Sequence, residues 1–497
     1  MYWANFLHFY QPAGQQPDIL EAVVVQSYRP ILRGIQEHKN VRLTLNINGA
    51  LLELFDKHQH RDLIDTLREL VKEGRLELTT SAKFHALLPF LEEKEIVRQI
   101  ETNNETLHFY FDHDYRPVGF FPPEMAYDER LPKIVESLGF KWMILDEIAK
   151  SGKTQTVDYR KLYKIKDTGL LVFFRERRPS NLIMSAVVRS YDSLKEVMKE
   201  DFASDRYLIT GMDGETFGHH RPGLEKMLFE MFKSSDFKLV QVSDLINYYK
   251  DIEEVEPVKS TWASSEEDIE RDVQFLSWKD PQNEIHAWQW ELVNLTLRSV
   301  YDLKENHVCY ADIRTRMDAA LASDHFWWAS AKPWWSLEEI ERGAFMCLDV
   351  VRRIPNISHK SVERAGKLYE NIVSTAFEWK RSGKIYQIAK ERQGVFRIPF
   401  RERTFEQGGV EKGVYEGFVA MFKELEKKAA ENQEYEKAIM WRDAIYKIEN
   451  KSDIYDMIHA TELLRTKIPN EQVEKMLDKY TERYKKIRGG QPEQRGA

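Results

Sequence analysis

The sequence predicts an α/β protein, a barrel of about seven parallel strands followed by a mostly α-helical C-terminal region. From the start to about residue 245, short β-branched or aromatic runs alternate with longer amphipathic stretches. Strands that alternate with helices in this way form a parallel sheet, and about seven such repeats favour closure into a barrel. Beyond about residue 285, apolar residues recur at helical spacing almost to the end, as in an antiparallel helical bundle.

Each repeat of the barrel region contains a run with the length and composition of a buried strand. These runs are Trp3–Phe9, Val41–Ile47, Leu76–Thr79, Val118–Phe121, Trp142–Leu145, Leu171–Arg175 and Tyr207–Gly211. Helical spacing predicts helices in both regions, for example over Asp62–Lys72, Glu93–Phe111, Ser361–Lys380 and Gly413–Asn432. The acidic stretch Glu253–Lys259, which contains Pro257, is interpreted as a linker.

These patterns divide the 497 residues into four parts. We expect the barrel over residues 1–255 and a helical domain over 256–400 that completes the cleft at the barrel's mouth. A C-terminal helical region follows over 401–487. The tail 488–497, rich in Gly, Gln and Arg, is expected to be disordered.

Composition excludes several classes of function. The net charge of −8 argues against non-specific nucleic-acid binding, which requires a basic surface. The first residues lack the basic and apolar regions of a signal peptide, and no window reaches the roughly 18 apolar residues of a membrane helix. Two cysteines, Cys309 and Cys347, are few for a secreted chain of this size, so a cytoplasmic location is expected.

Polar, chemistry-bearing residues follow the expected strands directly. In barrels the chemistry lies at the C-terminal ends of the strands, and here Glu124 follows two prolines after the fourth strand, while Asp213 follows the seventh. Retaining glycosidases use two such carboxyl groups, held about 5 to 5.5 Å apart. The sequence also contains 12 Trp, four of them between residues 327 and 335. Because Trp rings stack on the C–H faces of sugars, this density favours carbohydrate binding, with an aromatic core as the alternative.

A metal site is a second interpretation of the same region. His8, His85, Asp213, His219 and His220 supply the donor types of a zinc hydrolase. Their spacing matches no helical H-x-x-x-H pair, however, and the adjacent His219 and His220 would point to opposite faces of a strand. No metal and no cofactor is therefore the preferred expectation.

Five short motifs, in order, resemble those of glycoside hydrolase family 57. They are His8-Phe9-Tyr10-Gln11-Pro12, Gly74-Arg75-Leu76-Glu77, Phe121-Pro122-Pro123-Glu124, Asp213-Gly214-Glu215-Thr216-Phe217-Gly218 and Asp324-His325-Phe326-Trp327. The motifs span about two thirds of the chain, and the fourth is the most specific. The resemblance implies a (β/α)7 barrel with a helical region, and an enzyme that acts on α-glucans or maltooligosaccharides.

The resemblance also implies roles for residues of these motifs. Glu124 would be the nucleophile and Asp213 the general acid/base. The substrate-binding residues would be His8, Tyr10, Gln11, Glu77, Glu215, His219, Asp324, Trp327 and Trp328. Two positions depart from the family's pattern, because Tyr10 replaces the second His of the first motif and Phe121 stands where members often have Trp.

A smaller resemblance lies near the C-terminus. Residues 425–448 resemble the UVR helical hairpin, which mediates protein–protein contacts, so a protein partner is one expectation for this segment. The alternative is an ordinary amphipathic hairpin.

The sequence thus predicts a retaining α-glucan hydrolase or glucanotransferase of the α-amylase or 4-α-glucanotransferase type. Two alternatives stay open at this point. One is a metal-dependent carbohydrate hydrolase or deacetylase on a similar barrel, and the other is a non-catalytic glucan-binding protein that uses the Trp cluster.

Overall fold

The computed structural model describes residues 1–112, 115–186, 188–332, 334–392 and 412–450, with a few single positions between 467 and 479. Residues 1–180, 198–214 and 232–388 pack into one compact unit. A second unit consists of residues 181–197, 215–231 and the described residues after 388. The expected tail over 488–497 lies outside the described residues.

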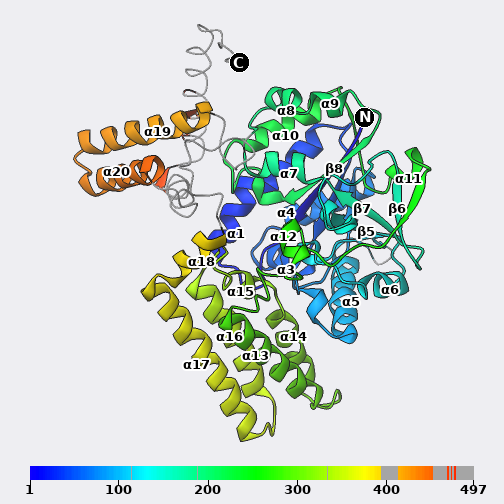
Figure 1. Cartoon of the computed structure of the whole chain (residues 1–497), viewed down its shortest axis with the longest axis vertical. Coiled ribbons are helices and arrows are strands. Elements are labelled where there is room, and N and C mark those ends of the chain that lie inside the picture. Colours follow the sequence, from blue (N-terminus) through cyan, green and yellow to red (C-terminus); the bar gives the residue numbers. More distant parts are fainter. Residues whose placement is uncertain are drawn as a thin grey trace. The chain divides into compact units, whose positions relative to one another are not determined.

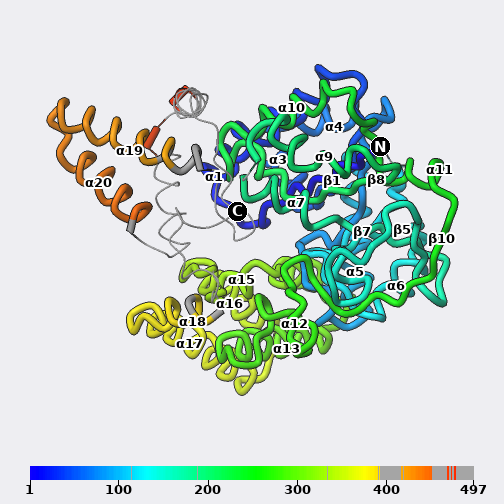
Figure 2. Tube along the Cα trace, turned by 45° about the horizontal axis from the view of Figure 1, so that its top comes forward, coloured from blue at the N-terminus to red at the C-terminus, as the bar shows by residue number. Residues whose placement is uncertain are grey.

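The first unit contains a barrel of parallel strands (Figures 1 and 2). Around the barrel the strands are β1 (Tyr2–Phe9), β2 (Leu43–Ile47), β3 (Leu76–Thr79), β4 (Gly119–Phe120), β5 (Trp142–Asp146), β7 (Leu171–Arg175) and β8 (Tyr207–Asp213). Parallel ladders join β3 to β2, β2 to β1 and β1 to β8, and likewise β4 to β5 and β5 to β7.

Two backbone contacts close the ring. Thr80, just after β3, bridges Phe120 of β4 in parallel fashion. On the other side the Glu176 N–H, just after β7, donates a 2.9 Å hydrogen bond to the Ile209 carbonyl of β8. The predicted (β/α)7 barrel is therefore confirmed. Each strand matches its expected run to within two residues, because runs of buried apolar residues are a local signal.

Helices connect the strands of the barrel. Those of the first unit in this part of the chain are α1 (Pro17–Val23), α2 (Arg29–Glu37), α3 (Gly49–Lys57), α4 (Arg61–Lys72), α5 (Glu93–Tyr110), α6 (Leu131–Ser137) and α9 (Lys199–Phe202). In α4 the buried residues Leu63, Ile64, Leu67 and Leu70 follow helical spacing and form a single face. The expected helices over 62–72 and 93–111 thus correspond to α4 and α5.

The expected linker over 253–259 begins with a strand instead. β10 (Ile252–Val255) pairs in parallel with β6 (Leu162–Ile165), which runs antiparallel to β7. The acidic side chains that suggested a linker are paired across this edge, Glu253 with Lys161 and Glu254 with Lys164. β10 is the edge strand of its sheet, where charged side chains such as Glu253 and Glu254 are common, so the acidic composition did not distinguish a strand from a linker.

The helical part of the first unit begins after β10. Its helices are α12 (Glu266–Glu270), α13 (Glu284–Tyr301), α14 (Tyr310–Ala320), α15 (Asp324–Trp327), α16 (Leu337–Arg353) and α17 (His359–Ser382), and the short helix α11 (Leu245–Tyr248) lies just before β10. The long helices α13, α16 and α17 pack side by side (Figure 1). α17 buries Leu368, Ile372 and Ala376 at four-residue intervals and ends at Ser382, followed by Gly383, whose φ of 77° is the left-handed conformation of a helix C-cap.

A buried ionic cluster fixes this helical part to the barrel. Arg314 of α14 pairs with Glu95 of α5 and with Asp318 of its own helix, and all three side chains are at most 3% exposed. Arg98 of α5 makes a bidentate bond to Asp318, with Nε 3.0 and 2.9 Å from the two carboxylate oxygens. The barrel and the bundle are therefore joined by directional bonds as well as by apolar packing.

The C-terminal part of the second unit contains a helical hairpin. α19 (Lys412–Glu431) and α20 (Tyr435–Asn450) pack through a small apolar core that includes Phe422, Leu425 and Trp441. The helix expected over 413–432 is confirmed, whereas the likeness to a UVR hairpin stays a prediction.

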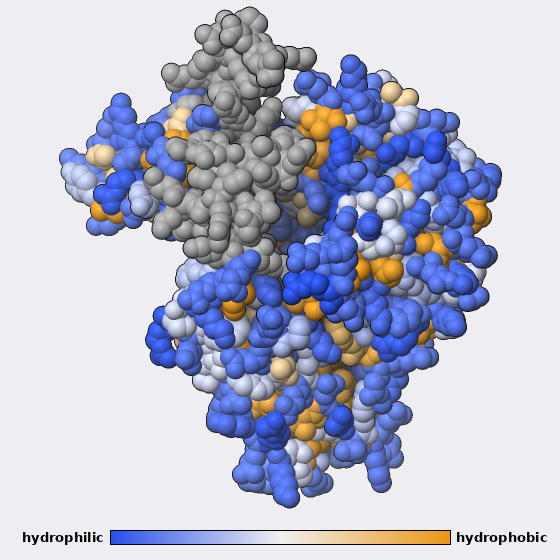
Figure 3. Space-filling model, in the orientation of Figure 1, coloured by the Kyte–Doolittle hydropathy of each residue, from blue (hydrophilic) through white to orange (hydrophobic). Residues whose placement is uncertain are grey.

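The surface, the helices and the cysteines relate to the expectations drawn from composition. Hydrophilic residues cover most of the face drawn in Figure 3, with smaller apolar areas between them. Among the described residues, no helix combines the length and the apolar character that crossing a bilayer requires. Cys309 and Cys347 are both free thiols.

Candidate active site

Glu124 lies in a strained turn at the mouth of the barrel. The turn Pro123–Met125 follows β4, and Glu124 has a φ of 61°, in the left-handed region that non-glycine residues seldom adopt. The Trp262 indole N–H donates a 2.7 Å hydrogen bond to Glu124 Oε2, and the Trp262 backbone N–H bonds the Glu124 carbonyl at 3.1 Å. Strain that the surroundings hold in place is typical of functional sites.

Asp213 is the last residue of β8 and lies opposite His8 in the register of β1 and β8. The next residue must be small, since a Cβ at Gly214 would come within 2.2 Å of the Phe9 ring. Burial raises the pKa of Asp213 to about 6, and the positive charge of Arg175 opposes this rise.

The two carboxyl groups act on each other electrostatically. Burial raises the pKa of Glu124 to about 8, and the negative charge of Asp213 adds to the rise against the hydrogen bond from Trp262. Between about pH 6 and about pH 8 the pair therefore holds a single proton. In the free protein Arg175 favours the proton on Glu124, because it stabilises the Asp213 anion.

A polar network at the ends of β5, β7 and β8 supports this pair. Arg175 is 2% exposed and donates to the Gly211 carbonyl at 2.6 Å and to Asp146 at 2.7 Å. Asp146 also accepts from Arg177 at 2.6 Å, and Arg177 in turn donates to the Trp262 carbonyl at 3.0 Å. One network thus places the cation beside Asp213 and the indole that holds Glu124.

His8 lies at the mouth of the barrel but is bonded to other side chains. Its Nδ1 is 2.8 Å from Asn46 Oδ1, and its Nε2 is 3.2 Å from His85 Nε2. Burial lowers the pKa of His8 to about 4 and holds the pKa of His85 well below its usual range, so both rings are neutral near pH 7. His85 Nδ1 is 3.9 Å from Glu124 Oε1 and so connects this pair of rings with the carboxyl group.

Tyr10 contacts the helical part of the unit. Its ring stacks on His85 with centroids 4.2 Å apart, and its hydroxyl donates a 2.6 Å hydrogen bond to Asp324 at the start of α15. The negative charge of Asp324 adds a smaller contribution to the raised pKa of Glu124. Tyr10 and Asp324 are thus assembled with the carboxyl pair.

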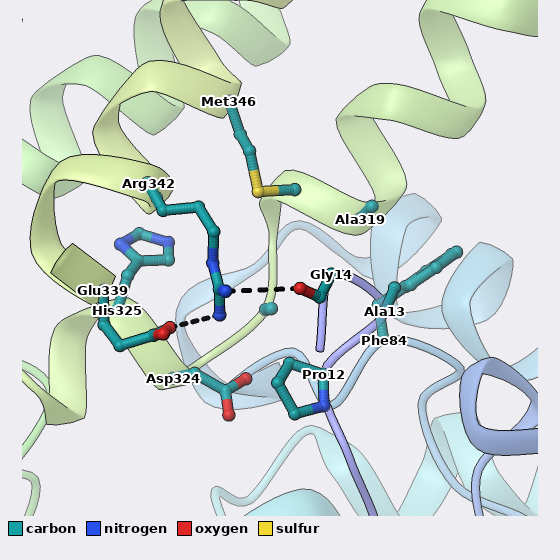
Figure 4. Close-up of a pocket in the computed structure, with 12 residues that line it drawn as sticks. Pro12, Ala13, Gly14, Phe84, Ala319, Asp324, His325, Glu339, Arg342 and Met346 are labelled. Atoms are coloured by element: carbon teal, nitrogen blue, oxygen red, sulfur yellow. Dashed lines mark hydrogen bonds and ion pairs between the residues drawn. The ribbon is translucent and has the colours of Figure 1, made fainter. Parts of the chain in front are cut away.

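A small pocket adjoins Asp324 (Figure 4). Arg342 lies across it, with Nη1 3.3 Å from the Gly14 carbonyl and with an ion pair to Glu339. Pro12, Phe84 and Met346 give the pocket an apolar wall. The pocket therefore combines an aromatic ring with charged side chains next to the candidate site.

Glu77 does not join the carboxyl pair. It precedes Thr79 by two residues on β3, so its side chain lies one layer, roughly 6.6 Å, deeper in the barrel. Its carboxylate accepts hydrogen bonds from Thr44 at 2.9 Å and from Ser243. Gln11 is 8% exposed and bonds Tyr28 and Gln15, which makes it part of the packing below the loop after β1.

The remaining predicted residues lie in two places. Glu215 and His219 belong to the second compact unit, where both side chains are buried. Trp327 and Trp328 come three and four residues after Asp324 and are partly buried, and Trp327 stacks on Trp334 with centroids 4.6 Å apart. Trp328 meets Trp327 edge-on, so the predicted Trp cluster exists as a packed group of rings.

Three residues of the site are absent from the predicted set. Trp262 lies in a loop 138 residues after its partner Glu124, and no motif marks it. Asn46 and Arg175 could have been found by the rule that pointed to Glu124, because each lies at the C-terminal end of a strand. Within the part of the chain that is described, no group of three His, Cys, Asp or Glu side chains is arranged to hold a metal ion.

Comparison with known proteins bears on both fold and family. Residues 17–259 match the model of glycosyl hydrolase family 57. The α-amylase of Pyrococcus horikoshii is 24% identical over 251 residues, which are 49% of this chain and 38% of that protein. The 4-α-glucanotransferase of Thermococcus kodakarensis is 29% identical over 152 residues, or 30% of this chain and 22% of that protein. The chain therefore matches well under half the length of either curated relative.

A solved structure extends the likeness beyond the barrel. The GH57-type branching enzyme of Pyrococcus horikoshii superposes with a TM-score of 0.59 over 76% of this chain and 95% of that chain. The sequence identity is 15%, so this comparison supports the shared fold alone.

Proposed function

Because the chain belongs to glycosyl hydrolase family 57 through its barrel region, we propose that it is a retaining enzyme of α-glucans, a hydrolase or a glucanotransferase. In this proposal Glu124 is the nucleophile and Asp213 is the general acid/base. The observation that carries it is the pair of partly buried carboxyl groups in the turn after β4 and at the end of β8, close enough for the charge of Asp213 to raise the pKa of Glu124.

The first step breaks the glycosidic bond. Glu124 Oε1 attacks the anomeric carbon, while Asp213 gives its proton to the oxygen of the departing sugar chain. Oε2 is held by the Trp262 N–H, which leaves Oε1 as the attacking atom. The result is a glycosyl ester on Glu124 with inverted configuration at the anomeric carbon.

The second step restores the α configuration. Asp213, now ionised, takes a proton from water or from a sugar hydroxyl, whose oxygen attacks the anomeric carbon from the face that the leaving group vacated. The ester bond breaks and Glu124 leaves as a carboxylate. Two inversions give net retention, and the acceptor decides between hydrolysis and transfer.

The proposed roles require the proton on Asp213 when substrate is bound, whereas the free protein favours it on Glu124. The two arrangements differ only in which member of the pair carries the shared proton. A sugar oxygen that accepts a hydrogen bond from Asp213 would stabilise its protonated form. Binding of the substrate would thereby place the proton where the first step needs it.

Trapping the intermediate tests the assignment. A 5-fluoro-α-glucosyl fluoride should label the protein with one hexosyl group, and peptide mass spectrometry should locate that group on Glu124. Incubation with maltoheptaose separates the activities, since shorter products alone mean hydrolysis and longer ones mean transfer. A label on another residue, or no turnover of any maltooligosaccharide, would contradict the proposal.

The protein partner expected from the hairpin α19–α20, and the cytoplasmic location expected from composition, remain predictions. Neither one enters the proposed mechanism.

A further inference from the structure

His85 is fixed on several sides at once. Its backbone has a φ of 57°, which is unusual for a residue with a side chain. The Ser323 N–H bonds the His85 carbonyl at 3.2 Å, and the His85 Nδ1 lies 3.0 Å from Ser323 Oγ. The imidazole stacks on the ring of Tyr10, with centroids 4.2 Å apart, and it meets the edge of the His8 ring, whose centroid is 5.1 Å away.

The hydrogen positions in this cluster follow from its end members. The Thr79 carbonyl can only accept, and it lies 3.4 Å from Asn46 Nδ2, so the amide nitrogen of Asn46 must face Thr79. The amide oxygen of Asn46 then faces His8 Nδ1 at 2.8 Å. His8 therefore carries its proton on Nδ1, and its Nε2 is unprotonated and can accept a hydrogen bond.

The same reasoning fixes the tautomer of His85. His8 Nε2 accepts across the 3.2 Å contact, so His85 Nε2 must be the donor. A neutral imidazole has one N–H, which leaves His85 Nδ1 without a proton. That nitrogen accepts from the Ser323 hydroxyl and is also the ring atom 3.9 Å from Glu124 Oε1.

We propose that His85 is a positioning residue. Its hydrogen bonds to Ser323 and to His8, which is itself bonded to Asn46, hold it in the neutral Nε2–H tautomer, so that its unprotonated Nδ1 faces the attacking oxygen of Glu124. The proposal deepens the proposed function, because it rests on Glu124 being the nucleophile. A ring in this state supports Tyr10 by stacking and packs beside Glu124 without donating to Oε1.

Proton placement matters here because His85 is surrounded by acidic groups. Glu124 faces it directly, Tyr10 on its other side bonds Asp324, and Asp213 lies opposite His8 in the register of β1 and β8. Were His85 protonated on Nδ1, its N–H would place positive charge 3.9 Å from Glu124 Oε1, the oxygen that Trp262 leaves open. Positive charge this close would stabilise the carboxylate and weaken it as a nucleophile.

Nitrogen NMR of the full chain tests the tautomer directly. In protein labelled with 15N-histidine, we expect pyrrole-type signals for His8 Nδ1 and His85 Nε2 and pyridine-type signals for His8 Nε2 and His85 Nδ1. Assignment comes from the spectra of His85→Asn and His8→Asn. The pattern should persist from pH 8 to pH 6. A pyrrole-type Nδ1 on His85, or a ring that titrates within that range, would overturn the proposal.

Asn46→Asp tests the consequence for activity. A carboxylate at position 46 favours a second proton on His8, whose Nε2–H must then donate to His85 and force the proton of His85 onto Nδ1. We expect kcat on maltoheptaose to fall by roughly ten- to a hundredfold at pH 6, with a smaller loss at pH 8 and little change in KM.

The matched control is Asn104→Asp, which adds the same charge on α5 and keeps the oxygen that accepts from Thr80. It should leave kcat unchanged. An equal loss at both pH values, or the same loss in Asn104→Asp, would contradict the proposal. Since the NMR pattern needs no turnover, it separates failure of this inference from failure of the proposed function.

Discussion

The hydroxyl of Tyr10 donates a 2.6 Å hydrogen bond to Asp324, which lies 314 residues further along the chain. Tyr10 follows the first barrel strand and Asp324 begins α15, so this one bond joins the barrel to the helical part of the same unit. It also occupies an oxygen of Asp324, a residue that resemblance to the family assigns to sugar binding. A histidine at position 10, as in the family's pattern, would be shorter than the tyrosine that spans this gap.

We therefore expect Tyr10→Phe to release Asp324 for the substrate. The ring would still stack on His85, but the competing donor would be gone. One hydrogen bond is worth about 0.5 to 1.5 kcal/mol, so KM for maltoheptaose should fall by about three- to tenfold with a smaller change in kcat. Initial rates measure this. Tyr386→Phe, at an exposed position, is the control, and a rise in KM for Tyr10→Phe would mean that the hydroxyl itself holds the sugar.

The two carboxyl groups should be distinguishable by chemical rescue. Asp213→Ala removes the acid/base and should lower kcat by about 10²- to 10⁴-fold, and azide should restore turnover by attacking the glycosyl ester to give an α-glycosyl azide. Glu124→Ala cannot form the ester, so azide attacks the substrate itself and yields the β-anomer. NMR of the products reads the configuration, and the opposite pairing of variant and anomer would exchange the two roles.

The shared proton predicts a bell-shaped pH dependence. Below about pH 6 both carboxyl groups are protonated and no nucleophile is present, whereas above about pH 8 both are ionised and no acid remains. The ratio kcat/KM should therefore be highest between these values. Measurement from pH 4 to pH 10 on maltoheptaose tests this expectation. Activity that keeps rising above pH 9 would show that the proton is not required.

The raised pKa of Glu124 also predicts a cost in stability. A carboxyl group whose pKa is higher in the folded state than in the unfolded state destabilises the fold progressively as the pH rises towards the folded pKa. With a rise from 4.5 to about 8, Glu124→Gln should be as stable as the parent at pH 4 and more stable by a few kcal/mol at pH 9. Urea unfolding at both pH values measures the difference, and a gain of equal size at pH 4 would assign it to something other than ionisation.

Much of this architecture could be predicted, because its signals are local. The seven strands could be predicted from runs of apolar residues. Glu124 and Asp213 could be predicted as site residues because they follow the ends of strands. The position of the Glu77 side chain along the barrel axis could not be predicted, because it depends on the register of β3 against β2. This register places Glu77 beside Thr44, below the mouth of the barrel. Trp262 was missed for a similar reason, because its bond to Glu124 arises only when a distant loop packs over the barrel.

The ionic cluster between α5 and α14 leads to a further prediction, on the attachment of the helical part. Arg314 is 3% exposed and pairs with Glu95 and Asp318, so Arg314→Met would leave the buried Glu95 without its cation and Asp318 with Arg98 alone. Breaking a buried pair from one side costs about 3 to 5 kcal/mol, mostly the penalty of the uncompensated charge. We expect a loss of this size in the free energy of unfolding measured with urea.

The control is Arg316→Met, on the same helix with an exposed pair to Asp312, which should cost less than about 1 kcal/mol. Equal losses in the two variants would mean that the substitutions act through the helix itself, whereas a loss confined to Arg314 would show that the buried charges hold α14 against the barrel.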